Sequence, residues 1–220
     1  CPDSFKDILR QYQEKDYQLD YEYRRFYSAY DQIEDPSAFE PLRDLVENIY
    51  TNEYLETLLP KWSNAIQESD ALTALPLQRD FYSRNLKNAK ERTVVIISDA
   101  LRYEVGKELF QKMQDDPKCT AKLEVQLSVL PSYTRLGMAA LLPHSELAMT
   151  DDFKVLVDGL PCENLSERET ILQKYNHDGV CVRFDDIRSL KIADLRSVFT
   201  GKQVVYVYHN QIDARGDKPN

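Results

Sequence analysis

Three polar segments of the chain carry side chains that are suited to phosphate chemistry. The first segment holds Asp99 and Arg102, and the second holds Thr134 and Arg135. The third holds a group of potential metal ligands and proton donors, namely His209, Asn210, Asp213 and Asp217. Carboxylates bind hard divalent cations, an activated threonine hydroxyl is a nucleophile, and a guanidinium group can hold phosphate oxygens. The three segments together therefore predict a phosphoryl-transfer site.

Each of these side chains also has a simpler structural interpretation. Asp99 could cap the helix that follows it, and Thr134 or Ser132 could cap the next helix, because such side chains accept hydrogen bonds from a helix's first amides. Asp213 and Asp217 could belong to a solvated polar turn. Taken one at a time, Asp99 and Thr134 fit capping better than chemistry. Chemistry is favoured only because all three segments are expected at one edge of a sheet.

The first segment follows Val94–Ile97, an unbroken run of β-branched apolar residues. Such a run suits a strand buried on both faces, as in a parallel sheet covered by helices. Further strands are expected at 123–127, 153–157, 180–184 and 203–208, and helices at 101–113, 134–141, 166–175 and 187–199. Strands that alternate with helices predict a parallel α/β sheet with right-handed crossovers. Ligands of such sheets bind outside the carboxyl ends of the strands, which is where Asp99 is placed.

The ends of the helix expected at 166–175 have their own sequence signals. Ser166 is followed three residues later by Glu169, which is the pattern of a capping box at a helix start. Gly179 lies just beyond the helix and is typical of a residue that ends one. We therefore expect Ser166 to cap this helix and Gly179 to close it.

The first 90 residues differ in composition from the rest. They hold no glycine and nine of the fourteen tyrosines, which predicts helices. Apolar residues at helical spacing predict one helix over 19–33, a second that stops at Pro60, a third that includes Leu72, and a fourth over 77–90. We expect the aromatic stripes to form the core of a helical bundle, with a partner-binding face as the alternative. The predicted domains are thus a helical region at 1–90 and an α/β domain at 91–220.

Composition excludes some classes of protein and favours others. The chain has 220 residues, a net charge of -9 and no apolar run of the roughly 20 residues that a membrane helix needs. The acidic balance argues against coating of nucleic acid by bulk charge, although a local basic groove remains compatible with it. The four cysteines form no C-x-x-C pair, which fits a reducing cytoplasm. A chain that starts at Cys1 rather than Met is expected to be a fragment.

Three stretches of the sequence resemble a known family. They read V-V-I-I-S-D-A-L-R-Y-E-V-G, then L-P-S-Y-T-R-L-G-M-A-A-L-L-P, then V-Y-V-Y-H-N-Q-I-D-A-R-G-D-K. In these stretches the chain resembles the PglZ domain, a member of the alkaline phosphatase superfamily whose proteins serve in bacterial BREX-type phage resistance. The resemblance covers residues 71 to 218 and implies an alkaline-phosphatase-like parallel-sheet core preceded by an all-α region.

The resemblance also implies roles for individual residues. Asp99 corresponds to the first metal-binding aspartate of the superfamily, and Thr134 to the nucleophile that also contacts metal. Asp213 corresponds to the aspartate of a D-x-x-G-H element, which reads D-A-R-G-D here, so Asp217 stands where many relatives have histidine. The cofactor would be a divalent metal (Zn, Mn or Mg), two ions in the full-length protein, and carboxylate ligands favour Mg or Mn. Arg102 and Arg135 would assist catalysis, with His209 and Asn210 in support.

The resemblance further implies a function and its limits. The expected activity is metal-dependent hydrolysis of a phosphomonoester, a cyclic nucleotide or a nucleic-acid phosphodiester. The superfamily's later Asp-His pair and a further histidine do not follow before Asn220, so the domain core is expected to be incomplete and the fragment by itself nearly inactive. The expected partners are the substrate, possible nucleic acid and other defence proteins, without a membrane.

Two other functions fit the same sequence. A catalytically silent, phosphatase-like scaffold could assemble a defence complex through the tyrosine-rich helices. A response-regulator-like binding domain would also place acids at strand ends, but it has no place for the T-R-L-G-M-A-A-L-L-P stretch. Fold alone does not decide among these functions.

Overall fold

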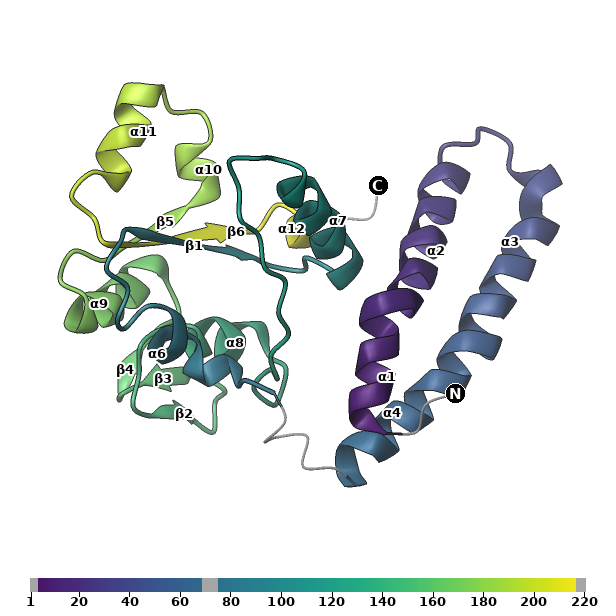
Figure 1. Cartoon of the computed structure of the whole chain (residues 1–220), viewed down its shortest axis with the longest axis horizontal. Coiled ribbons are helices and arrows are strands. Elements are labelled where there is room, and N and C mark those ends of the chain that lie inside the picture. The colour runs from purple at the N-terminus through teal and green to yellow at the C-terminus, as the bar shows by residue number, and fades with distance from the viewer. Residues whose placement is uncertain (1–3, 69–74, 217–220) are drawn as a thin grey trace. The chain divides into compact units, whose positions relative to one another are not determined.

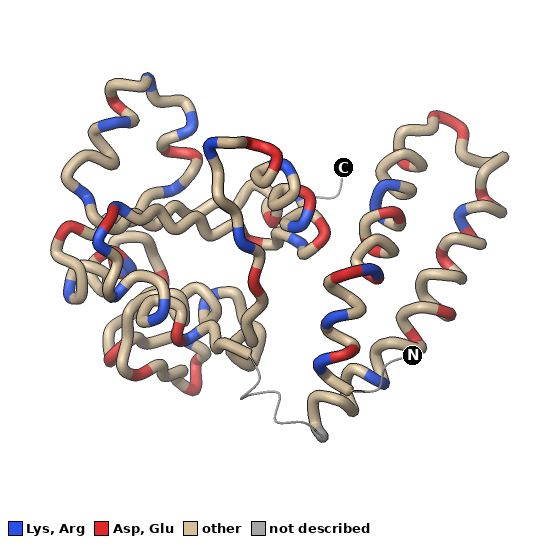
Figure 2. Tube along the Cα trace, in the orientation of Figure 1, with Lys and Arg blue, Asp and Glu red and all other residues tan. Residues whose placement is uncertain are grey.

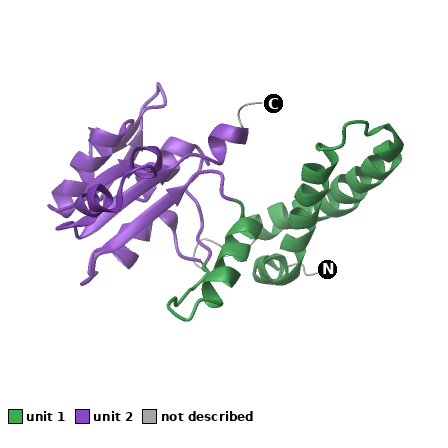
Figure 3. Cartoon of the chain, turned by 90° about the horizontal axis from the view of Figure 1, so that it is seen from above, with its two compact units in different colours: residues 1–74, 102–124 green, residues 75–101, 125–220 purple. Residues whose placement is uncertain are grey.

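The computed structural model describes residues 4–68 and 75–216, which belong to two compact units (Figure 1). Figure 3 colours the two units, of which unit 1 contains residues 1–74 and 102–124 and unit 2 contains residues 75–101 and 125–220. This division transfers the segment 102–124 to the helical unit. From the sequence we predicted a single domain boundary near residue 90, whereas each compact unit contains two segments of the chain. The domain boundary stays a prediction.

Unit 1 is built from two helical arms and a further helix. The first arm consists of α1 (Phe5–Gln11), a π-helical turn η1 (Tyr12–Asp16) and α2 (Tyr17–Tyr30) (Figure 1). The second arm consists of η2 (Ser37–Phe39), α3 (Glu40–Asn48), a π-helical segment η3 (Ile49–Leu55) and α4 (Glu56–Glu68). The helix α7 (Tyr103–Gln114) packs against α2, and α1 packs against α4. The predicted helical character of this region is confirmed.

The second arm does not stop at Pro60, contrary to the sequence prediction. Pro60 lies inside α4, and Pro41 lies in the first turn of α3, where proline is well tolerated. A proline inside a helix removes one backbone hydrogen bond and crowds the preceding turn. The π-helical segment η3 directly precedes α4, and such irregular turns are the usual places where helices accommodate this disturbance. Leu72, expected in a third helix, lies outside the described residues.

The predicted bundle core is not what these arms form. No residue of α2, α3 or η3 is buried, and Leu19 and Leu45 are 45% and 54% exposed. Two antiparallel arms give each helix few neighbours, so a stripe on one face cannot be enclosed. Among the described residues of unit 1, the buried apolar side chains are Phe5, Ile8 and Ala65, where α1 meets α4.

Unit 2 is organised around a parallel sheet in the order β1-β6-β5, which confirms the predicted α/β class. Its strands are β1 (Thr93–Ser98), β5 (Val180–Arg183) and β6 (Val204–His209). In Figure 1, α6, α8 and α9 lie on one side of this sheet and α10 and α11 on the other. The helices are η4 (Gln78–Asp80), α6 (Phe81–Asn85), α8 (Thr134–Ala140), α9 (Leu165–Tyr175), α10 (Phe184–Ile187), α11 (Ile192–Phe199) and α12 (Asp213–Gly216).

The central strand β6 provides most of the core of unit 2. Val204, Val205 and Tyr206 have no exposed surface, and the Tyr206 hydroxyl donates to the Leu141 carbonyl oxygen at 2.7 Å. The edge strand β1 is different, because Val94 and Ile96 are 41% and 67% exposed. The prediction that β1 is buried on both faces is therefore wrong for the described residues, which cover only one face.

Several expected elements of unit 2 differ in the structure. Residues 123–127 form no strand, and Leu127 makes only an isolated bridge to Leu77. The strand expected at 153–157 is β3 (Val155–Val157), but it pairs antiparallel with β2 (Leu147–Met149) and β4 (Leu160–Pro161) in a second small sheet. The helix expected at 187–199 is divided between α10 and α11, and that expected at 77–90 is reduced to η4 and α6. Short apolar runs do not show which strand they would pair with, which explains the errors at 123–127 and 153–157.

The helix α9 is present as predicted, but its ends are made differently. Asn164, rather than Ser166, is the capping residue, and it forms the capping box with Glu167. Gly179 is not the helix cap, which is Asn176. A β-carbon at Gly179 would lie 2.6 Å from Leu172 Cγ, so glycine is required there by close packing.

In the part of the chain that the structure describes, helices are too short or too polar to cross a membrane.

Candidate functional site

Asp99 lies directly beyond the carboxyl end of β1, as predicted. Its backbone amide donates to the His209 carbonyl oxygen at 3.0 Å, and its Oδ1 accepts from the Ala100 amide at 3.0 Å. Ala100 has a φ of 59°, which turns the chain sharply away from the strand. The capping residue of α7 is Arg102, without a side-chain cap. The interpretation of Asp99 as a helix cap is therefore wrong.

Ser98 and His209 form a pair that the sequence did not reveal. They are register partners at the ends of β1 and β6, and Ser98 Oγ lies 2.9 Å from His209 Nδ1. The edge of the Phe184 ring faces the imidazole, with ring centroids 4.9 Å apart. Within the described residues Nε2 of His209 has no hydrogen bond, so it remains available to a ligand. Only knowledge that β6 lies beside β1 could have predicted this pair.

Asp213 follows the strand adjacent to β1. It begins α12, a single turn in which the Ala214 amide donates to the Asn210 carbonyl oxygen at 3.0 Å. Asp99 and Asp213 are thus both delivered by loops at the carboxyl edge of the sheet, since β1 and β6 are parallel neighbours. Asp217 lies outside the described residues.

The side chains at the carboxyl edge offer oxygen atoms that could bind a metal ion. Carboxylate and hydroxyl oxygens are suitable ligands for a hard divalent cation. However, the described residues contain no group of three His, Cys, Asp or Glu side chains positioned to share one ion. These residues fit a metal in chemical type and do not by themselves complete its coordination.

Thr134 is exposed at the first position of α8. The capping residue of this helix is Tyr133, and no side chain makes a capping hydrogen bond, so neither Thr134 nor Ser132 is a cap. The described residues offer the Thr134 hydroxyl no hydrogen-bond partner. Arg135 beside it forms an ion pair with Glu163. The hydroxyl is thus free to act on a ligand, whereas Arg135 would have to exchange its carboxylate partner.

Arg102 belongs to unit 1, whereas the other predicted site residues belong to unit 2. It is exposed at the start of α7. Its positive charge acts to lower the pKa of Tyr50. Burial and a hydrogen bond to Asp20 nevertheless raise the pKa of Tyr50 to about 12. Within unit 2, the carboxyl edge of the sheet carries Asp99, His209 and Asp213.

A family model described as "BREX system PglZ alkaline phosphatase-like domain" matches residues 80–220. The chain belongs to the PglZ family. It is 42% identical over 218 residues to an "Alkaline phosphatase-like protein PglZ" of Bacillus cereus (strain H3081.97), which covers 96% of this chain and 26% of that protein. It is 36% identical over 220 residues to an "Alkaline phosphatase-like protein BrxZ" of Escherichia coli O9:H4 (strain HS), covering 94% of this chain and 25% of that protein.

This member of the PglZ family thus spans about a quarter of the length of the curated relatives it matches. Both relatives carry an alkaline-phosphatase-like description, as the family model does, and the family model also names the BREX system. No solved structure matches the chain significantly. The resemblance read from the three sequence stretches is confirmed, and the individual roles of the site residues stay predictions.

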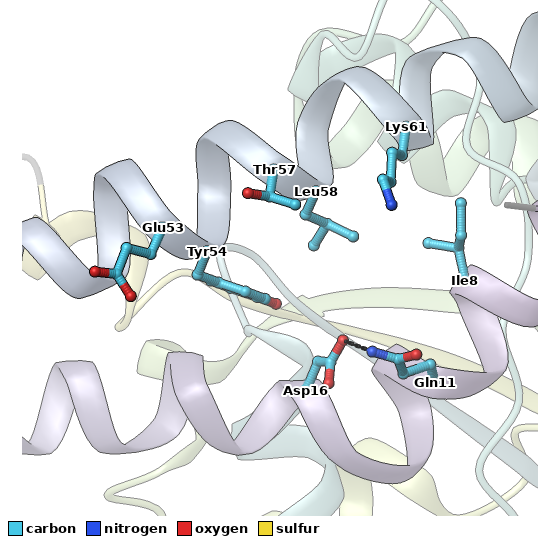
Figure 4. A pocket seen from close by; sticks show the side chains of 8 residues that line it. All are labelled: Ile8, Gln11, Asp16, Glu53, Tyr54, Thr57, Leu58 and Lys61. Atoms are coloured by element: carbon cyan, nitrogen blue, oxygen red, sulfur yellow. Dashed lines mark hydrogen bonds between the residues drawn. The ribbon is translucent and has the colours of Figure 1, made fainter. Parts of the chain in front are cut away.

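The helical unit of this PglZ-family chain has a polar pocket of its own. Figure 4 shows its lining from the two arms, with Gln11 Nε2 donating to Asp16 Oδ2 at 2.8 Å (Figure 4). The lining residues are Ile8, Gln11, Asp16, Glu53, Tyr54, Thr57, Leu58 and Lys61. Asp16 is only 9% exposed, and the Tyr54 hydroxyl is buried without a partner among the described residues. This pocket was not predicted from the sequence, and the signal that could have indicated it is Asp16, which follows Ile8 and Tyr12 at helical spacing.

Proposed function

We propose that the whole protein hydrolyses a phosphate ester and that Thr134 is its nucleophile. The observation that carries this proposal is an exposed Thr134 hydroxyl, released from capping, in a chain of alkaline-phosphatase-like family membership. A threonine at the capping position, just before the first residue of a helix, usually accepts a hydrogen bond from the backbone amides of the first turn. Here that structural use is absent, which favours a chemical one.

The proposed reaction has two covalent steps. Thr134 Oγ1 loses its proton to solvent and forms a bond to phosphorus while the bond from phosphorus to the ester oxygen breaks, and the leaving oxygen takes up a proton. His209 is the candidate proton donor at the carboxyl edge, and Ser98 Oγ lies 2.9 Å from its Nδ1. Water then cleaves the bond between phosphorus and Thr134 Oγ1. Arg135 would hold a phosphate oxygen after leaving Glu163.

A divalent metal is part of the proposal. Asp99 and Asp213, with Asp217 of the same loop, would provide oxygen ligands, and further ligands would come from residues beyond this chain. Such ions, two of them in the whole protein and of Zn, Mn or Mg identity, lower the pKa of a bound hydroxyl and bind phosphoryl oxygens. Incomplete coordination leads us to expect weak metal binding by the 220 residues alone.

The substrate class proposed is a phosphomonoester or phosphodiester, including a nucleotide or nucleic acid, acted on in the cytoplasm. Along the Cα trace, positively and negatively charged residues are interspersed in both units rather than gathered by sign (Figure 2). The net charge of -9 likewise gives nucleic acid no independent support. The argument for it is the phage-defence setting named for the family.

A scaffold function is the second candidate, and the exposed side chains of unit 1 favour it. Leu19, Leu42, Leu45 and Ile49 are each at least 45% exposed along the two arms. Exposed apolar faces of this kind commonly bind another protein surface. In this alternative, the phosphatase-like unit is catalytically silent and the arms dock onto other defence-system proteins.

One experiment separates the two functions. Full-length protein would be assayed with bis-p-nitrophenyl phosphate and p-nitrophenyl phosphate in the presence of Mg²⁺, Mn²⁺ or Zn²⁺. Thr134→Ala should reduce turnover by at least about a thousandfold, as loss of a nucleophile does elsewhere. Thr170→Ala is the matched control, because Thr170 is also an exposed helical threonine but bonds to the Ser166 carbonyl oxygen.

The outcome would be read together with phage protection in cells. Turnover that requires metal and vanishes in Thr134→Ala supports the enzyme. Turnover that Thr134→Ala leaves unchanged contradicts Thr134 as nucleophile. Full phage protection by a folded Thr134→Ala protein would transfer support to the scaffold.

A further inference from the structure

A second polar cavity lies in unit 2, away from the carboxyl edge of the sheet. It has a volume of about 550 Å³. It is lined by residues from three segments, namely Arg79, Asp80, Tyr82, Ser83, Lys87, Leu142, Pro143, His144, Ser145 and Tyr175. Cavities of roughly 300–1,000 Å³ are typical of sites for small molecules.

The position of this cavity separates it from the candidate catalytic site. Tyr175 ends α9, and the next residue, Asn176, donates a 3.5 Å hydrogen bond to Gln203, which immediately precedes β6. The cavity therefore lies toward the amino ends of the strands, whereas Asp99 and Asp213 follow their carboxyl ends. It also borders the residues after the last turn of α8, whereas Thr134 begins that helix.

The charged groups around the cavity favour an anion. Within the described residues, Arg79 and Lys87 form no ion pair, and Asp80 is the single carboxylate of the lining. His144 Nδ1 lies 2.7 Å from the Leu142 carbonyl oxygen, an acceptor, so Nδ1 carries a hydrogen. Tyr175 is oriented from outside the cavity by its 2.6 Å hydrogen bond to Asp158. Two unpaired cations thus face one carboxylate.

Tyr82 supplies a second, independent observation. It is only 7% exposed and belongs to the hydrophobic core, yet it lines the cavity. Its ring packs edge-on against Tyr175, with centroids 6.3 Å apart, and burial raises the pKa of Tyr82, which keeps its hydroxyl protonated. Among the described residues this hydroxyl has no hydrogen-bond partner. Because the side chain as a whole is buried while it lines the cavity, the cavity is the side from which a ligand can accept a hydrogen bond from this hydroxyl.

We propose that this cavity binds a small phosphate-bearing molecule, at most the size of a mononucleotide. Arg79 and Lys87 would contact the phosphate oxygens, and the hydroxyls of Tyr82 and Ser83 would donate to them. Asp80 would accept from a hydroxyl or amino group on the rest of the ligand. The site is independent of the proposed hydrolysis, because none of its residues belongs to the carboxyl edge.

The test is calorimetric titration of the full-length protein with adenosine 5′-monophosphate and inorganic phosphate, with adenosine as the uncharged comparison. Titrations would be made in the Thr134→Ala background so that hydrolysis does not interfere. Arg79→Gln and Lys87→Gln should each weaken binding by about tenfold, and Tyr82→Phe by about threefold to tenfold. Arg84→Gln should change affinity by less than about twofold, because Arg84 is an exposed cation of α6, between Arg79 and Lys87 in the sequence, that does not line the cavity.

Three results would overturn the proposal. One is equal affinity in the wild-type, Arg79→Gln and Lys87→Gln proteins, which would place the bound phosphate elsewhere. Another is equal loss in Arg84→Gln, which would indicate diffuse surface attraction. A third is binding of a 20-nucleotide single-stranded DNA with no binding of the mononucleotide, which would indicate a nucleic-acid surface. Arg79 and Lys87 are exposed, so their variants are expected to fold.

Discussion

The two units of this chain are stabilised in different ways. In unit 2 the residues of β6 from Val204 to Tyr208 are all buried, and helices and a second sheet enclose them. In unit 1 the helices α2 and α3 have no buried residue. Apolar burial scales with the area removed from water, so it stabilises unit 2 far more than unit 1. The comparison shows one chain combining an enclosed hydrophobic core with an open helical hairpin.

Hydrogen bonds contribute a larger share of the stability of unit 1 than of unit 2. The hydroxyls of Tyr12 and Tyr50 donate to Asp20 at 2.6 and 2.8 Å, and those of Tyr23 and Tyr27 donate to Glu47 at 2.7 and 2.6 Å. The rings of Tyr23 and Tyr50 stack with centroids 3.7 Å apart and planes 13° apart. All of these contacts except the bond from Tyr12 to Asp20 connect the two arms. They explain the abundance of tyrosine, which combines an apolar ring with a hydrogen-bonding end.

A third contact of unit 1 joins α2 to α7. Glu104 is only 3% exposed and forms an ion pair with Arg24 at 2.8 Å. A buried carboxylate is tolerated only when a partner offsets its desolvation. This pair therefore specifies how α7 packs onto α2 rather than adding much stability.

The largest difference between the units should come from truncating one leucine in each. Leu172→Ala removes a side chain with no exposed surface from the core of unit 2 and should lower the free energy of unfolding of that unit by about 2–5 kcal/mol. Leu45→Ala removes one that is 54% exposed and should change the stability of unit 1 by less than about 0.5 kcal/mol. Hydrogen exchange by mass spectrometry on the full-length protein reports each unit separately. A loss above about 2 kcal/mol in Leu45→Ala would show that the rest of the protein covers this face.

A smaller and opposite pair of effects is expected from two glycines. Gly179→Ala should destabilise unit 2 by about 1–3 kcal/mol, because its β-carbon would lie 2.6 Å from Leu172 Cγ and 2.9 Å from the Asn176 carbonyl oxygen. Gly106→Ala should stabilise α7 by about 0.5–1 kcal/mol, because nothing lies within 4 Å of its β-carbon and alanine favours helix. Denaturant titration measures both. A stabilising Gly179→Ala would contradict the close packing of α9 on β5.

The smallest effect is a pH dependence centred on unit 1. Burial, followed by the hydrogen bond to Asp20, raises the pKa of Tyr50 to about 12, above the value near 10 expected in the unfolded chain. Its contribution to stability is therefore complete below pH 10 and is lost as the pH rises from about 10 to about 12. Tyr50→Phe should lower stability at pH 8 and flatten its decline above pH 10 in denaturant titrations. Tyr21→Phe is the control, since the Tyr21 hydroxyl makes no hydrogen bond within the described residues, and an equal flattening there would contradict the assignment.

The sequence predicted best the elements whose signals are local. The run Val94–Ile97 became β1, and the helices beginning near Tyr103 and Thr134 were found at their expected places. The parallel class followed from alternation of strands and helices. Local periodicity could not reveal that 153–157 pairs antiparallel, because register partners are set by residues distant in the chain.

Prediction of the candidate site was limited by the same physical reason. Asp99 and Asp213 were placed at strand ends from local patterns, and parallel pairing puts those ends together. The contact between Ser98 and His209 depends on an alignment of β1 with β6 that no local pattern contains. The cavity around Tyr82 depends on three separate segments, and the exposed arms of unit 1 depend on how few neighbours each helix has. Sequence periodicity states which face is apolar, but not what covers it.

The pairing of β1 with β6 has a consequence for how the protein is made. Ser98 and His209 are 111 residues apart, and every residue pair along β1 and β6 has this separation. During synthesis β1 leaves the ribosome long before the strand that must lie beside it, and closing so long a loop is slow. In that interval an unpaired, β-branched strand edge is open to other nascent chains. The sheet that carries the candidate site can therefore be completed only after β6 has been synthesised, 111 residues after β1.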